Sequence, residues 1–203
     1  DKIIALTFLP IEQIGYYTII QMSLGRISLL TQSIAKVIFP EFSSKNGLSD
    51  EDERKFTMIA SFNIAIMTPF YIVLFVFSQE IGQLLIGDIA SEYLEIISLT
   101  IKLMSVYFGM NMIFRLYRSL ISSSRFVSRL AIADGIGVSF SLPLAIWLTS
   151  TQGLIGLAIG LCVFFLLSGP ITIISVYKYL LKKQSILNFI GFVLGVLFIA
   201  MIV

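Results

Sequence analysis

The sequence predicts an all-α integral membrane protein, a multi-helix transmembrane bundle of about six spans plus a truncated seventh. Of its 203 residues, 57% are hydrophobic and only 13% are charged, as is typical of a chain whose solvent is mostly lipid. Eleven of its fourteen Lys and Arg residues fall in three clusters between apolar runs, and the two loops that alternate with these clusters, 79–92 and 150–152, contain none. This positive-inside pattern is typical of a protein that crosses a membrane repeatedly.

The spans follow from the uncharged runs, because a spanning helix needs roughly 20 mostly apolar residues at 1.5 Å each. The first two should end at Pro10 and Pro40, since proline stops a helix. We expect residues 1–181 to form one bundle. The last residue, Val203, lies inside an apolar run, and the first residue is Asp1 rather than Met, so we expect the chain to be part of a longer protein. The predicted spans are 1–9, 15–39, 56–78, 93–121, 130–149 and 153–177, with the start of a further transmembrane helix in 186–203.

One connection has a start signal of its own. Ser49 precedes Asp52 by three residues, and acidic residues occupy the first turn, as at a capped helix N-terminus. We expect a short surface helix that leads into the 56–78 span, or else a site that docks a partner.

The loop charges predict the orientation. Outer loops are short and hold acids without bases, which leaves no room for an external catalytic domain and points to a function inside the bundle. The cytoplasmic clusters are Lys36, Lys45, Arg54 and Lys55; Arg115, Arg118, Arg125 and Arg129; and Lys178, Lys182 and Lys183. The outer acids are Glu12, Glu80, Asp88, Glu92 and Glu95.

Enzyme signals are missing from the sequence. The chain has no His, one cysteine (Cys162) and no Gly-rich phosphate loop, so the usual zinc, haem, nucleotide and Ser/His/Asp sites are excluded. We expect no catalytic residue, metal or cofactor, and we expect Cys162 to be a buried apolar residue. The net charge of +2 is sorted by side and does not indicate nucleic acid.

Charges within the predicted spans are the functional candidates, because each costs about 2.5–3.5 kcal/mol at a helix centre on insertion scales. They are Asp1, Arg26, Lys102 and Asp134, together with Lys2. Asp1 and Arg26 both lie roughly 14–16 Å below the outer surface on consecutive helices, so an ion pair between them is geometrically plausible. Such a pair could bind substrate or only stabilise packing.

The second span carries a polar stripe, whose members follow each other at spacings of three and four residues. In lipid such a face must meet other helices or water, so it serves either interhelical hydrogen bonding or a substrate path. Gln21 and Gln32 of this stripe are cavity candidates, and Arg26 lies about 100° around the helix from Gly25 of the stripe. The stripe is formed by Thr18, Gln21, Gly25, Ser28, Gln32 and Lys36.

Lys102 and Asp134 lie at intermediate depth. Lys102 is roughly 12 Å from the outer end of its span, so it either reaches a cavity or extends outward to the interface. Asp134 could pair with Arg129 or with groups near Arg26, or it could titrate and carry a coupling proton.

The order of these features resembles a known family. The chain has Asp1-Lys2 before an apolar stub, then Ile14-Gly15-Tyr16-Tyr17, a polar-striped helix that ends in Phe39-Pro40-Glu41-Phe42-Ser43, a Ser122-Ser123-Ser124-Arg125 turn, and Gly153-Leu154-Ile155-Gly156-Leu157-Ala158. Over nearly its whole length it resembles the second half of bacterial polysaccharide flippases. These are the O-antigen (Wzx-like) flippases of the multidrug/oligosaccharidyl-lipid/polysaccharide flippase superfamily.

The resemblance implies one lobe of a V-shaped flippase, with the six spans as helices seven to twelve; the truncated seventh departs from that plan. It implies a multi-pass protein of the bacterial inner membrane that flips undecaprenyl-pyrophosphate-linked oligosaccharide repeat units for lipopolysaccharide, O-antigen or capsule biosynthesis. Arg26 and Lys102 would attract the pyrophosphate. The implied partners are the lipid-linked oligosaccharide and membrane lipids, with a coupling cation and a glycan polymerase as further candidates.

Other functions fit parts of the pattern. A lipid II flippase or a cation-coupled multidrug exporter of the same superfamily is the nearest alternative, although the partly basic mid-depth residues favour an anionic substrate. A membrane glycan polymerase or ligase is an alternative from another class, which the short outer loops disfavour. A non-transporting scaffold is a third.

Overall fold

The computed structural model describes residues 1–43, 48–87 and 91–181. These residues form seven α-helices, and none of them lies in a β-strand. The fold class is therefore all-α, as predicted. The helices are α1 (Lys2–Phe8), α2 (Ile11–Ser43), α3 (Asp50–Val76), α4 (Ser78–Ile86), α5 (Ser91–Ser122), α6 (Val127–Gln152) and α7 (Leu154–Tyr179).

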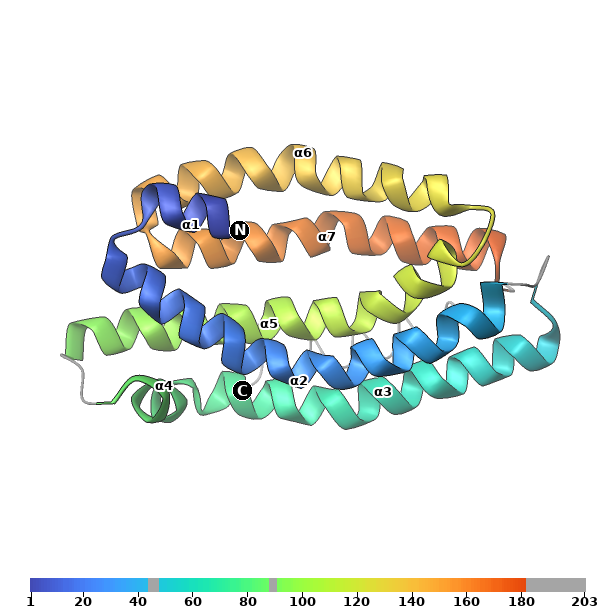
Figure 1. The fold of residues 1–203 in the computed structure, drawn as a ribbon, viewed down its shortest axis with the longest axis horizontal. Coiled ribbons are helices and arrows are strands. Elements are labelled where there is room, and N and C mark those ends of the chain that lie inside the picture. Colours follow the sequence, from blue (N-terminus) through green and yellow to red (C-terminus); the bar gives the residue numbers. More distant parts are fainter. Residues whose placement is uncertain (44–47, 88–90, 182–203) are drawn as a thin grey trace.

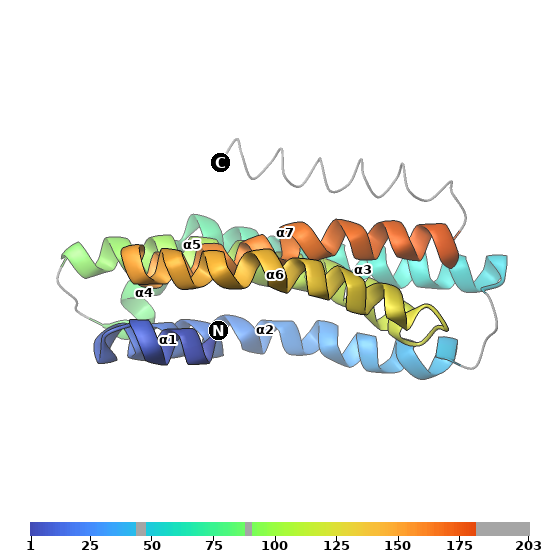
Figure 2. The ribbon, with the colours of Figure 1, turned by 90° about the horizontal axis from the view of Figure 1, so that it is seen from above.

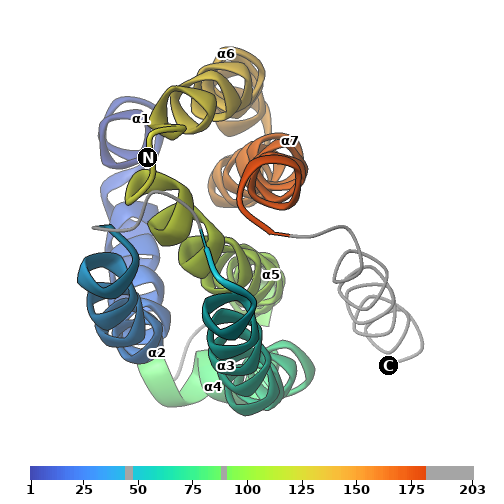
Figure 3. The ribbon, with the colours of Figure 1, turned by 90° about the vertical axis from the view of Figure 1, so that its right-hand side faces the viewer.

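The long helices run roughly along one axis, and α5 lies at the centre of the bundle (Figure 1). It contacts α2, α3, α4, α6 and α7. Seen end-on, α2, α3 and α4 lie on one side of α5, with α6 and α7 on the other (Figure 3). Ile97, Ile101 and Met104 of α5 are completely buried, because apolar side chains surround this helix on most sides.

The basic clusters gather at one end of the bundle. The last turns of α2, α5 and α7 lie at the same end as the first turns of α3 and α6 (Figures 1 and 2). Arg54, Arg118, Arg129 and Lys178 belong to these turns. Cations that are far apart in the sequence therefore share one end, which is the arrangement that the positive-inside pattern predicts.

Among the described residues, four helices are long and apolar enough to span a membrane: α3, residues 93–122 of α5, α6 and α7. The 33-residue α2 has the length but is not among them, and it carries Glu12, Arg26 and Lys36 together with the polar stripe. Six spans plus a seventh stays a prediction. The range 186–203 lies outside the described residues.

The boundary expected at Pro40 is wrong. α1 and α2 do separate at Pro10, but α2 continues through Pro40 to Ser43. A proline removes one backbone donor and crowds the carbonyl four residues earlier, at Lys36. That disturbance is confined to one turn, so the helix carries on for three further residues.

The N-terminus of α3 is confirmed at Ser49. The Ser49 hydroxyl accepts a hydrogen bond from the backbone N–H of Asp52 (3.2 Å), and the Asp52 carboxylate accepts one from the Ser49 N–H (3.1 Å), which completes a capping box. The helix then runs unbroken to Val76. The short surface helix expected before the 56–78 span is therefore the first turns of α3 itself.

The tightest helix contact joins α6 to α7 through glycine. Gly153 makes the turn between them at φ +61°, a conformation that favours glycine. A Cβ placed on Gly156 would overlap the backbone carbonyl of Leu148, and one on Gly160 would overlap Ala145. Gly156 and Gly160 thus form a contact face of small residues, because only their missing side chains let the two backbones approach.

This contact predicts a sharp difference between two glycine substitutions. Gly156→Ala should lower the free energy of unfolding by about 1–3 kcal/mol, because the new methyl group meets main chain that cannot rotate away. The apparent Tm of the purified protein in detergent should fall by roughly 2–4 °C for each kcal/mol.

The matched control is Gly135→Ala in α6, where nothing lies within 4 Å of the new Cβ. That change gains helix propensity and should leave the Tm unchanged or raised. Equal Tm values for the two variants would contradict the close α6–α7 contact.

Candidate functional site

Asp1 is held by two side chains of α2. Its carboxylate accepts hydrogen bonds from the Tyr17 hydroxyl (2.7 Å) and the Gln21 side-chain amide (2.6 Å), and it caps α1 through the Lys2 N–H. The structure thus brings together two predicted site residues, Asp1 and Gln21. The Asp1–Arg26 ion pair does not form. Tyr17 and Gln21, which donate to Asp1, lie on the side of α2 that faces α1, whereas Arg26 lies roughly 180° around the helix from Tyr17.

Arg26 lies at the middle of α2 and is exposed. Met22 and Val37, both exposed, lie within roughly 40° of it around the helix. In the described part of the chain no carboxylate forms an ion pair with Arg26. A permanent cation therefore stands on the outward face of this bundle, at the depth of the membrane centre if α2 spans it.

The polar side of α2, which comprises the stripe and Thr31 beside it, makes hydrogen bonds both within the helix and to α3. Gln32 donates from its amide to the Ser28 hydroxyl (3.2 Å), which in turn donates to the Gly25 carbonyl (2.6 Å). Beside the stripe, Thr31 donates to the Asn63 side-chain oxygen of α3 (3.0 Å). Interhelical hydrogen bonding thus accounts for part of this polar side, while Gln32 also borders an open pocket.

Lys102 does not join the other candidates. Its ammonium lies 5.9 Å from the centre of the Phe75 ring on α3. Lys102 and Arg115 are separated by 13 residues, which is roughly 220° around α5. The two cations of α5 therefore point to different sides, and Lys102 lies against an aromatic face.

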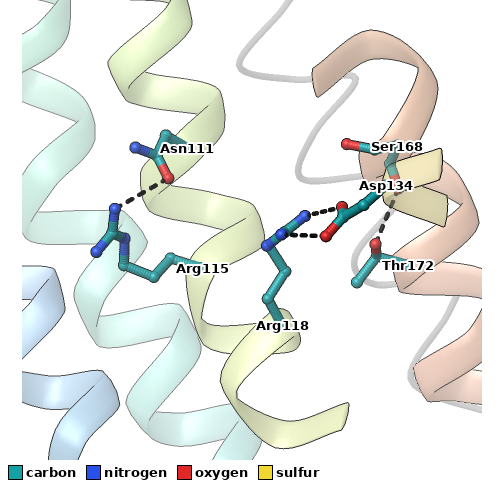
Figure 4. Close-up of polar contacts among 6 residues, drawn as sticks. All are labelled: Asn111, Arg115, Arg118, Asp134, Ser168 and Thr172. Carbon is teal, nitrogen blue, oxygen red and sulfur yellow. Dashed lines mark hydrogen bonds and ion pairs between the residues drawn. The ribbon is translucent and has the colours of Figure 1, made fainter. Parts of the chain in front are cut away.

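Asp134 forms a two-pronged ion pair with Arg118 of α5. The distances are 2.5 Å from Nη1 to Oδ1 and 2.6 Å from Nη2 to Oδ2, with the two side chains 27% and 30% exposed (Figure 4). This corrects the expectation of an Arg129 or Arg26-side partner. Arg129 is five residues from Asp134, roughly 140° around α6, and its guanidinium lies 5.2 Å from the Tyr179 ring centre instead.

A polar residue of α7 lies close to this ion pair. Ser168 is fully buried beneath Gly137, one turn along α6 from Asp134, and its hydroxyl has no hydrogen-bond partner among the described residues. Figure 4 shows Ser168 and Thr172 on α7 beside Asp134.

Cys162, on the same helix, is buried as expected, with its thiol 3.3 Å from the Leu103 carbonyl.

Sequence reasoning treated Arg115 only as a topology signal, but it lines a pocket between α2 and α5. The pocket has a volume of about 250 Å³ and is lined by Gln32, Ala35, Lys36, Arg115 and Ser119. Arg115 donates to the Asn111 side-chain oxygen at 3.4 Å (Figure 4). The four- and three-residue spacings of Asn111, Arg115 and Arg118 mark one polar face of α5, a signal that could have identified it.

No family model, curated protein or solved structure matches this chain. What the site can do must therefore be argued from its geometry. Its described cations differ in their partners: Arg118 is neutralised by Asp134, whereas Arg26, Lys36 and Arg115 have no carboxylate ion-pair partner in the described ranges. Such an arrangement attracts anions.

The Arg118–Asp134 pair should behave as a unit. Arg118→Gln or Asp134→Asn alone leaves the other charge partly buried and unpaired, which should lower the free energy of unfolding by about 1–3 kcal/mol. The double variant R118Q/D134N should lose less than the sum of the single variants, with a coupling of about 0.5–3 kcal/mol. Thermal unfolding of the four proteins in detergent measures this cycle.

Arg129→Gln serves as the control, because Arg129 is an exposed cation of the same helix. It loses only a contact with Tyr179, worth at most about 1 kcal/mol at an exposed site. Additive losses in the R118Q/D134N cycle would show that the ion pair does not couple α5 to α6.

Proposed function

We propose that this chain is the C-terminal bundle of a bacterial polysaccharide flippase, a carrier that moves a lipid-linked oligosaccharide across the inner membrane. In this proposal the chain supplies six spans and the start of a seventh, and it forms one lobe of a V-shaped protein. The anionic group that the carrier recognises is the undecaprenyl-linked pyrophosphate.

The single observation that carries the proposal is the position of Arg26. Arg26 lies at the centre of a 33-residue helix, is exposed among apolar side chains and has no carboxylate partner in the described residues. If it faced lipid, its charge would carry a free-energy cost of about 2.5–3.5 kcal/mol. The cost falls if the outward face of α2 borders a water-filled cavity shared with a second lobe. A cation in such a cavity favours an anionic substrate over a cationic drug.

Transport of this kind needs no bond to be made or broken. The carrier has only to offer the pyrophosphate charge-assisted hydrogen bonds while the cavity is open to one leaflet and then to the other. Asp134 is already neutralised by Arg118, so a proton-carrying role for it would first require that pair to open. Lys102 contributes less directly, since it lies against Phe75.

The test is complementation of a flippase-null bacterium by the full-length parent gene. Arg26→Ala should abolish or strongly reduce surface polysaccharide and cause the lipid-linked unit to accumulate in the cytoplasmic leaflet, because the cavity loses its central cation. Arg54→Ala removes an exposed cation from the first turns of α3 and should leave both readouts near the wild-type level.

Expression of both variants is measured by immunoblot, so that loss of protein is not mistaken for loss of transport. Equal effects of Arg26→Ala and Arg54→Ala would contradict a cavity role for Arg26. A well-expressed wild-type parent that restores nothing, but confers resistance to cationic drugs, would replace the proposal with an exporter.

A further inference from the structure

The pocket between α2 and α5 is a second cationic position, separate from Arg26. Lys36 and Gln32 border it from α2, and Arg115 and Ser119 border it from α5. The Ser119 hydroxyl donates to the Ala35 carbonyl at 3.0 Å, which fixes the two helices together at the pocket. The pocket is therefore built by a side-chain contact between helices that are 84 residues apart at this point.

The charges of the pocket are not balanced within the described residues. Neither Lys36 nor Arg115 forms an ion pair there, and the neighbouring Arg118 is occupied by Asp134. One N–H of Arg115 donates to the neutral amide oxygen of Asn111, and its other N–H groups can donate to a ligand. Two cations that border one small space repel each other, and an anion between them removes that repulsion.

If α2 and α5 both span the membrane, the pocket lies at the edge of the hydrocarbon core, next to the layer of lipid headgroups. Lys36 and Arg115 each lie seven residues before the end of their helix, which is roughly 10 Å along the axis. The two helices are roughly 50 Å long, against roughly 30 Å for the hydrocarbon core, so each extends about 10 Å beyond both boundaries when centred. The pocket then lies at the boundary on the side of the basic clusters.

The pocket is small and open to its surroundings. Its volume of about 250 Å³ is below the roughly 300–1,000 Å³ of sites that enclose drug-sized ligands. The space between its cations therefore fits a small charged group, while the rest of a larger molecule would lie outside it. Guanidinium and ammonium groups are the usual protein ligands of phosphate, arginine through paired hydrogen bonds and lysine as a point charge.

We infer that this pocket binds a phosphate group at the cytoplasmic boundary of the membrane, with Arg115 and Lys36 as its cationic ligands and Gln32 as a neutral one. The phosphate can belong to an anionic lipid headgroup or to a phosphate compound in solution. Binding at this position does not require that the protein transport a glycan, and it can therefore be measured without any transport assay.

The experiment uses the full-length protein purified in an uncharged detergent. In the lipid arm, native mass spectrometry compares retained phosphatidylglycerol with phosphatidylcholine, whose phosphate is already neutralised by its own cation. In the soluble arm, calorimetry measures the binding of inorganic pyrophosphate. K36Q/R115Q should weaken binding of the retained probe at least tenfold, and Lys36→Gln alone should weaken it measurably.

The matched control is R54Q/R125Q, which removes two exposed cations from the same end of the bundle; its affinity should stay within about twofold of wild type. Lys36 is itself exposed, so Lys36→Gln keeps the test decisive if the Arg115 variant fails to fold.

Phosphatidylglycerol binding alone would assign the site to lipid, and pyrophosphate binding would extend it to soluble phosphates. Absence of binding in both arms, or unchanged binding in the pocket variants, would overturn the inference. Loss of glycan transport with phosphate binding intact would count only against the proposed function.

Discussion

The cost of a charge in hydrocarbon decides where the polar side chains of a membrane bundle can lie. Each charge at a helix centre costs about 2.5–3.5 kcal/mol on insertion scales, so the fold must give each one a partner, a polarisable surface or water. Arg118 and Asp134 neutralise each other, and Lys102 lies against the ring of Phe75. Arg26 has no ion-pair partner in the described bundle, and in the proposed flippase the cavity shared with a second lobe would give it polar surroundings.

α5 connects the two sides of the bundle, and its polar face is where they are joined. Ser119 bonds to the main chain of α2 at Ala35, while Arg118, one residue earlier, pairs with Asp134 of α6. The same turns place Arg115 in the pocket beside α2. If α6 moves relative to α2, α5 can follow only one of the two helices. The movement must therefore break either the Ser119 contact or the Arg118–Asp134 pair.

The sequence predicts what is local and misses what depends on helix rotation. The capped N-terminus at Ser49 follows from a short-range pattern and is confirmed, as is the all-α class. The partner of Asp134 was predicted wrongly, because charge spacing along one helix does not fix which face meets α5. For the same reason Arg115 was assigned to the loop signals, although it borders a pocket. The end of α2 was set too early because Pro40 disturbs only one turn.

Two cationic positions on one helix constrain how an anion could pass this bundle. Lys36 and Arg26 are ten residues apart, roughly 15 Å along α2 and roughly 80° around it. An anion held at the boundary by Lys36 therefore cannot reach Arg26 by a small shift, and it would lose its first partner before gaining the second. Water must fill that interval, or the bundle must move so that a second surface supplies donors along it. In the proposed carrier, the second of these alternatives corresponds to a cavity that opens to one leaflet and then to the other.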